Sequence, residues 1–269
     1  MFIEYLNSKY IKYFIFYLNF DIKYNVSIRD NKNISSLPLI NITKLYLYDK
    51  FNQNIDFISN LPLKILKLGN YFDHSIHKLS ESRNLKKLKI GNSFNQPIDD
   101  ILPKNLKVLS LGYKFNQSVD HLPLDLKELT LGYCFNQPIN HLPQNLRILD
   151  LENSIFNQSI NHLPDSLKEL ILGYNFNQPL NDLPKNLKIL YLLSNNRFLN
   201  QIPNNIEELT LYGRLNSMKF LPNNLRILKL YDFNQEINYL PDKLEKLFLS
   251  RFYLHSTDHL PKTIEIIKS

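Results

Sequence analysis

Four histidines occupy one repeated position, directly before a Leu-Pro pair: His121, His141, His162 and His259. In an array of stacked coils, side chains at one repeated position lie about 5 Å apart, so several imidazoles could share a zinc or nickel ion. Other copies of the position hold Asp182 or Tyr239, a variation that a surface turn tolerates. We therefore interpret the histidines as turn residues, and the sequence predicts no metal and no cofactor.

Other residues that could perform chemistry lack the partners that catalysis needs. Cys134 is the only cysteine, and its repeated position holds Lys114 and Asn175 elsewhere, so no base accompanies it. The carboxylates of Glu207 and Glu208 are adjacent on an expected strand and point to opposite faces. No two glycines lie close enough to cradle a phosphate. The sequence predicts a protein that is not an enzyme.

Basic residues recur as regularly as the histidines. One position carries Lys or Arg in eight copies: Lys64, Lys86, Lys107, Lys127, Arg147, Lys168, Lys188 and Arg226. The formal net charge is +7, so a nucleic-acid backbone could be tracked by this row. A row of lysines also keeps a sheet of apolar strands soluble. We favour the solvated edge, because aromatic residues on the expected sheet are scattered, and nucleic-acid binding remains the alternative.

The elements that position these residues follow from an internal repeat. A Leu-x-x-Leu-x-Leu frame, with Ile at some positions, starts at twelve places between Ile42 and Ile264, spaced 19 to 22 residues apart. Eleven of the 14 prolines precede the frame, and five of the six glycines directly follow it. The motif Phe-Asn-Gln-Pro recurs 41 residues apart, which indicates duplication of a two-repeat segment.

One coil illustrates the expected structure. Leu129 and Leu131 alternate with polar residues, as on a short strand with one buried face. Gly132 ends the strand where a side chain would crowd the neighbouring coil. A coil this short cannot bury its leucines alone, so coils must stack. The sequence predicts a leucine-rich-repeat-like solenoid of about twelve coils, with a curved parallel β-sheet and extended or 3₁₀ segments on the convex side.

The solvent-facing strand positions on the concave side are the candidate contacts for a protein partner. Exposed aliphatic side chains are unusual on a surface that binds nothing. The candidates are Glu128, Thr130, Ile148, Asp150, Glu169, Ile171, Ile189 and Tyr191. A protein partner is predicted, and its identity and the oligomeric state are left open.

The tripeptide Phe-Asn-Gln is interpreted as part of the scaffold. Its Phe is expected in the core, so the next amide is expected to be buried and to need hydrogen-bond partners. Amides at one repeated position can bond the backbone of neighbouring coils. This predicts a structural ladder of Asn95, Asn116, Asn136, Asn157 and Asn177.

The tandem Phe-Asn-Gln-Pro-Ile and Leu-Pro-x-x-Leu-x-x-Leu-x-Leu motifs resemble the FNIP repeat family, a relative of leucine-rich repeats. The resemblance spans residues 37–268. The family occurs in social amoebae and in giant DNA viruses of amoebae. The resemblance implies a protein-interaction array without catalytic residues. Some members carry an N-terminal F-box that recruits a ubiquitin ligase, so a ubiquitin-ligase substrate adaptor is an alternative function, beside a purely structural protein.

Residues 1–36 lie outside the repeat, and residues 37–269 form the array. The N-terminal segment is shorter than an F-box, and we expect a helix that caps the first coil. Its longest apolar run is too short to span a membrane, and it has no cleavage site of a signal peptide. Together with the single cysteine, this predicts an intracellular protein, in the cytoplasm of the cell or of the virus-infected host.

Overall fold

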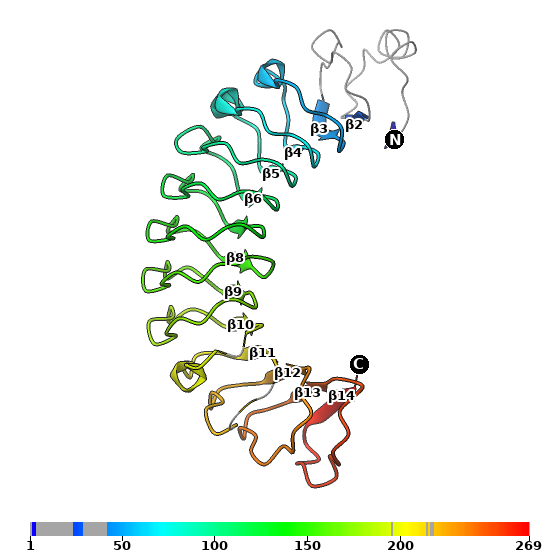
Figure 1. The fold of residues 1–269 in the computed structure, drawn as a ribbon, viewed down its shortest axis with the longest axis vertical. Coiled ribbons are helices and arrows are strands. Elements are labelled where there is room, and N and C mark those ends of the chain that lie inside the picture. The colour runs from blue at the N-terminus through cyan, green and yellow to red at the C-terminus, as the bar shows by residue number, and fades with distance from the viewer. Residues whose placement is uncertain are drawn as a thin grey trace. The chain divides into compact units, whose positions relative to one another are not determined.

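The computed structural model describes residues 2–3, 24–28, 42–194, 196–213, 215 and 218–268. By its internal contacts the chain divides into two compact units, Met1–Phe135 and Asn136–Ser269, here called the first and the second unit. Each unit is a stack of coils with its strands along one side and its turns along the other (Figure 1). The boundary falls inside one Phe-Asn-Gln motif, so the sequence repeat is the same in both units.

Every predicted copy of the repeat contains one strand, and two further strands precede them. In the first unit these are β1 Phe2–Ile3, β2 Tyr24–Ile28, β3 Ile42–Leu47, β4 Ile65–Lys67, β5 Lys87–Lys89, β6 Val108–Ser110 and β7 Glu128–Thr130. In the second unit they are β8 Ile148–Leu151, β9 Glu169–Leu172, β10 Ile189–Leu192, β11 Glu208–Tyr212, β12 Ile227–Tyr231, β13 Lys246–Leu249 and β14 Glu265–Lys268. The predicted leucine-rich-repeat-like solenoid with a parallel sheet is confirmed.

Within each unit successive strands pair in parallel, and apart from a register shift between β2 and β3 they pair in register. Leu66 lies opposite Leu45 and Leu88 in the first unit, and Leu190 lies opposite Leu170 and Leu209 in the second. These central leucines are fully buried. Because side chains alternate along a strand, the residues on either side of each central leucine face solvent. This alternation places the candidate contact residues on the outer face of the sheet.

The motif phenylalanines form the second layer of the core. In the first unit, the rings of Phe51, Phe72, Phe94, Phe115 and Phe135 follow one another at centroid distances of 6.1 to 6.3 Å and are nearly parallel. All five are 0% exposed. Burial of one such side chain contributes about 1.5–3 kcal/mol, so the column stabilises every coil in which it continues.

Glycine follows the strand because neighbouring coils approach very closely there. A Cβ atom on Gly112 would lie 2.4 Å from the backbone oxygen of Gly91, and one on Gly132 would lie 2.2 Å from that of Gly112. Backbone atoms cannot move aside as a flexible side chain can, so no other residue fits. This agrees with the crowding expected from the sequence.

Opposite the strands, the described residues form turns and, in three of the coils, one short 3₁₀ helix each: η1 Asp56–Ile58, η2 His77–Glu81 and η3 Leu199–Gln201. Each Leu-Pro-x-x-Leu segment forms a turn. The Leu126 N–H donates to the Pro123 oxygen at 3.0 Å, and Leu187 donates to Pro184 at the same distance. Proline suits this position because its own missing N–H is not needed by the turn.

The N-terminal segment differs from the predicted helix where the structure describes it. Phe2–Ile3 and Tyr24–Ile28 are strands, and β2 pairs in parallel with β3. The second stretch, Tyr-Asn-Val-Ser-Ile, contains aromatic and β-branched residues that favour strands, but it lacks the leucine frame used to recognise the repeat. The rest of the predicted helix lies outside the described residues. No helix in the described ranges is long and apolar enough to cross a membrane.

Candidate functional site

Six of the eight candidate contact residues lie together on β8, β9 and β10 of the second unit: Ile148, Asp150, Glu169, Ile171, Ile189 and Tyr191. Glu169 lies opposite both Ile148 and Ile189, and Ile171 lies opposite both Asp150 and Tyr191. All six are half-buried, whereas the leucines between them are buried. The six side chains therefore form one continuous area of the strand side, here called the isoleucine patch.

A second group on the same unit was not found from the sequence. The Lys229 ammonium lies 2.5 Å from the Glu208 carboxylate and faces the rings of Tyr191 and Phe248 at 5.7 and 5.6 Å. Burial is the largest single influence on the pKa of Lys229 and lowers it, but the hydrogen bond to Glu208, the charge of that carboxylate and the nearby Tyr191 and Tyr231 together raise the pKa above its ordinary value. A lysine between two rings gains a cation–π attraction in addition to the ion pair. The sequence feature that could have indicated this ion pair is the spacing of about one coil between Glu208 and Lys229.

The residues around Lys229 lie next to the isoleucine patch on the same face of the sheet and pack closely there. Thr210 lies between Tyr191 and Lys229 in register and is only 2% exposed, although it occupies a solvent-facing strand position. Its hydroxyl has no hydrogen-bond partner in the described part of the chain. Burial also raises the pKa of Tyr191, opposed in part by the nearby Lys229 charge. The surface here is packed, not hollow.

The other two candidates, Glu128 and Thr130, lie on β7 of the first unit. Glu128 is exposed and lies opposite Val108, and Thr130 is half-buried and lies opposite Ser110. Val108 and Ser110 are followed in register by Lys87 and Lys89, so these two candidates border only one apolar side chain and then basic residues. The eight candidates thus divide into the isoleucine patch of the second unit and two polar residues of the first unit.

The predicted row of basic residues has a different composition in the two units. In the first unit the row consists of Lys64, Lys86, Lys107 and Lys127. From Lys86 onward, the backbone N–H of each lysine donates to the backbone oxygen of the lysine one coil earlier. In the second unit the same row includes Glu207 and Glu245. They form ion pairs with Lys188 at 2.6 Å and with Arg226 at 2.8 Å. The row is therefore basic from Lys64 to Lys127 in the first unit and mixed in the second.

The asparagines bond neighbouring coils, but they are not buried. The Asn95 Oδ1 atom accepts the Asn116 backbone N–H at 2.9 Å and the Gln117 side-chain amide at 3.0 Å. In the second unit Asn157 accepts the Asn177 N–H at 2.8 Å. Asn95 and Asn157 are exposed, and Asn116, Asn136 and Asn177 are half-buried. The buried setting expected from the sequence is wrong, because only the preceding Phe enters the core.

The structure also assigns a part to the motif glutamine, which the sequence left unexplained. Gln158 donates to the Asn136 Oδ1 atom at 3.2 Å, and Gln178 donates to that of Asn157 at the same distance. Each asparagine oxygen thus accepts two bonds from the next coil. Asp73, which replaces Asn in one copy, accepts the same two bonds from Asn95 and Gln96. An acceptor oxygen is therefore what this position provides.

The histidines lie in turns, as the sequence suggested, and Cys134 also lies in a turn. His121, His141, His162 and His259 are exposed, and Cys134 is half-buried. The His121 Nδ1 atom is 3.8 Å from an Asp99 carboxylate oxygen. Within the described residues, no three His, Cys, Asp or Glu side chains are placed to hold a metal ion.

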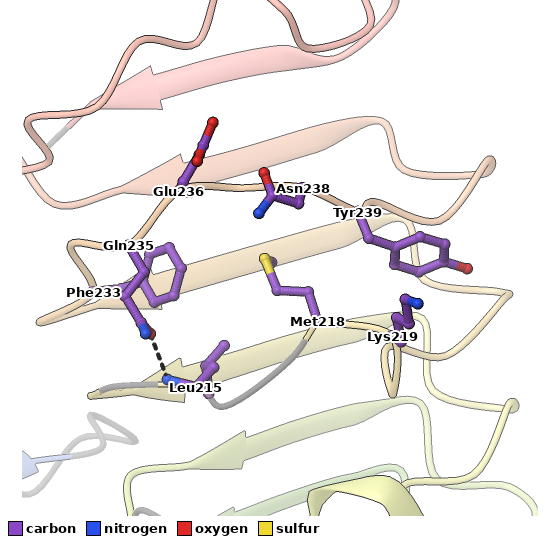
Figure 2. Close-up of a pocket in the computed structure, with 8 residues that line it drawn as sticks. All are labelled: Leu215, Met218, Lys219, Phe233, Gln235, Glu236, Asn238 and Tyr239. Carbon is purple, nitrogen blue, oxygen red and sulfur yellow. Dashed lines mark hydrogen bonds between the residues drawn. The ribbon is translucent and has the colours of Figure 1, made fainter.

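A cavity of about 410 Å³ lies in the second unit, where the phenylalanine column is interrupted (Figure 2). In the coil before Phe233, Leu215 occupies the position of the motif phenylalanine. Its side chain is smaller than phenylalanine and leaves space beside Met218. The Leu215 N–H donates to the Gln235 Oε1 atom at 2.8 Å, and Lys219, Asn238 and Tyr239 form the polar rim. The cavity lies among the turns, apart from the strand side, in the region where Leu215 replaces the motif phenylalanine.

Comparison with known proteins identifies the family. The sequence matches the FNIP Repeat family at residues 72–114, 94–134, 135–175, 156–192 and 218–252, which together make up more than half of the chain. The protein belongs to the FNIP repeat family. Among curated proteins, none matches this chain in sequence.

Two solved structures place the fold among leucine-rich repeats. One is CroV588 of the giant virus CroV, described as a novel circular LRR protein, with 31% identity and a TM-score of 0.58 over 93% of this chain. This chain spans 40% of the length of CroV588. The other is an internalin (inlF) of Listeria monocytogenes, with 17% identity, a TM-score of 0.52, and coverage of 84% of this chain and 80% of the internalin. The internalin shows likeness of fold alone.

Proposed function

We propose that this protein is a non-enzymatic interaction scaffold and that the isoleucine patch contacts a protein partner. The FNIP repeats and the leucine-rich-repeat-like fold are typical of interaction scaffolds, because stacked coils present an extended surface. The scaffold is expected to act in the cytoplasm, of a cell or of a virus-infected host, as the single cysteine suggests.

The observation that carries the proposal is the run of half-exposed apolar side chains on adjacent strands. Ile171 and Tyr191 lie opposite one another, and Ile148 and Ile189 flank Glu169 in register. Their partial exposure leaves apolar area that a partner can remove from water, at about 25 cal/mol per Å². The Glu169 and Asp150 carboxylates supply polar contacts at the same place, as expected of an interface with an apolar centre.

The group around Lys229 supports the same assignment. Tyr191 is half-buried, lies opposite Ile171 in register, and has the Lys229 ammonium 5.7 Å from the centre of its ring. An aromatic side chain that is already fixed loses little conformational entropy on binding, and tyrosine is enriched at the energetic centres of interfaces. Tyr191 is therefore the expected anchor of the patch.

The proposal is tested by affinity capture from an amoebal lysate with the full chain. Wild type is compared with an Ile148→Ser/Ile189→Ser/Tyr191→Ser variant and with a control that changes Tyr239, Phe252 and Leu254 to Ser. These control residues are exposed apolar residues of the same unit outside the strands.

A protein that wild type and the control retain and that the patch variant loses is the expected result. Nothing captured, or equal capture by the patch variant and the control, contradicts the proposal. Thermal unfolding of each variant is recorded beside the capture, so that a loss of partner is read only from folded protein.

A further inference from the structure

Six lysines gather on the strand side of the first unit, on β3, β4 and β5 and beside them. They are Lys44, Lys64, Lys67, Lys86, Lys87 and Lys89, here called the lysine face. Lys67 lies directly opposite Lys89, and the Lys86 N–H bonds the Lys64 oxygen at 2.9 Å. Lys64, Lys67, Lys87 and Lys89 are exposed, whereas Lys44 and Lys86 are half-buried.

The charges of the lysine face are not neutralised by the residues that the structure describes. None of the six ammonium groups forms an ion pair within the described ranges, whereas Lys107 in the next coil pairs with Asp125 at 2.6 Å. In the second unit the corresponding strand side pairs Lys229 with Glu208 and Lys246 with Glu265. The lysine face is therefore a local concentration of positive charge.

This arrangement opposes folding, since like charges directly opposite one another in a sheet destabilise it. Lys67 and Lys89 form such a pair in register. An anionic ligand seated between them would replace the repulsion with attraction. Binding of a polyanion to the lysine face is therefore favourable, because it removes this repulsion.

The size of the lysine face selects among polyanions. Strands β3 to β5 cover two strand spacings, about 10 Å, and Lys86 to Lys89 extends about 10 Å along the strand. Proteins that bind duplex nucleic acid through charge make roughly 6–10 phosphate contacts, which need a longer track. Four to six extended residues of a peptide, at about 3.3 Å each, cover the face fully.

The apolar residues among the lysines favour a peptide as well. Ile65 lies between Lys44 and Lys87 in register, and it is half-buried. Tyr46 lies opposite Lys67 and is the one aromatic residue on β3, β4 and β5. A single ring cannot stack successive bases, as binders of single-stranded nucleic acid do. It can contact the side chains that separate acidic residues in a peptide.

We propose that the lysine face binds an acidic segment of a protein partner, an extended run of Asp and Glu side chains. The partner's carboxylates pair with Lys67, Lys87 and Lys89, and Tyr46 and Ile65 contact its aliphatic atoms. This surface belongs to the first unit and does not depend on the isoleucine patch of the second. A loss of one binding activity therefore leaves the other to be measured.

The test measures binding of a fluorescein-labelled hexaglutamate peptide to the full chain by anisotropy, with a labelled oligothymidylate of equal charge as the competing class. A Lys67→Glu/Lys87→Glu/Lys89→Glu variant is compared with Lys50→Glu/Lys104→Glu/Lys114→Glu, which changes net charge equally at exposed lysines of the same unit. A Lys67→Gln/Lys87→Gln/Lys89→Gln variant serves in case charge reversal impairs folding.

Wild type is expected to bind the peptide, and the lysine-face variants are expected to weaken binding about tenfold or more, because close charge pairs are lost. The control should change it less than about twofold, because exposed charges at a distance are screened by salt. No peptide binding by wild type overturns the proposal, as does equal weakening by the lysine-face and control variants. Tighter, face-dependent binding of oligothymidylate assigns the lysine face to nucleic acid instead.

Discussion

The two units are built from the same coil but differ in the charges on their strand sides. In the first unit Lys67 lies opposite Lys89, and the lysine row beside them is uninterrupted. In the second unit acidic residues alternate with basic ones, and Lys229 is held by Glu208. Since both units have the same buried leucine columns, the solvent-facing residues are not determined by the fold. They can vary without disturbing the core, and the two units carry different residues there.

The largest expected effect tests what the units share. Phe115→Ala in the first unit and Phe176→Ala in the second each remove a ring that is 0% exposed and stacked on a neighbour. Each change should lower the free energy of unfolding by about 3–5 kcal/mol, as large-to-small core changes do. Hydrogen exchange should lose protection most strongly in the coils of the altered unit.

Leu254→Ala is the control for these core changes, because that side chain is 82% exposed. It should change the stability by less than about 0.5 kcal/mol. If either phenylalanine variant behaved like this control, the column would not be the common core of the two units.

The same charge reversal should have opposite effects in the two units. Lys229→Glu places a second carboxylate beside Glu208 in a half-buried site and should cost about 1–3 kcal/mol. Lys89→Glu turns the like-charge pair with Lys67 into an attractive one and should add about 0.2–1 kcal/mol. Urea unfolding at low and high salt measures both. Equal signs in the two units would remove the distinction drawn between their strand sides.

A further prediction concerns the amide oxygens, which both units use alike. Asn95→Ala and Asn157→Ala each remove an acceptor of two bonds from the next coil. Because both residues are exposed, water replaces part of the loss, and the cost should be about 0.5–1.5 kcal/mol. Asn95→Asp should retain most of the stability, since Asp73 already accepts the same bonds. Urea unfolding measures this series, and equal losses in Asn95→Ala and Asn95→Asp would contradict the acceptor role.

The sequence predicted the fold because its signals are local and repeated. The leucine frame, the prolines before it and the glycines after it each report one position of the coil, and twelve copies confirm the spacing. The strand at Tyr24–Ile28 was missed because a strand without the frame carries only a weak residue preference.

The candidate site was predicted less completely, because contacts between coils depend on register. Ile148 and Ile189 could be named as solvent-facing from the alternation alone. The contact of Lys229 with Tyr191 and Phe248 extends over four coils, from β10 to β13, and needs side-chain directions that a single repeat does not contain. The exposure of the motif asparagines was also invisible, because a residue beside a buried phenylalanine can point outward.

The asparagine oxygens give the stack a direction. Each oxygen accepts from the coil that follows it, as Asn95 does from Asn116, so the two sides of a coil are not equivalent. Each coil can stack only with its acceptor side against the donor side of the next coil. Tandem duplication always inserts a segment in that orientation, so it creates no mismatched surface. The array can therefore lengthen by copying itself, and every new junction is one that the protein already makes.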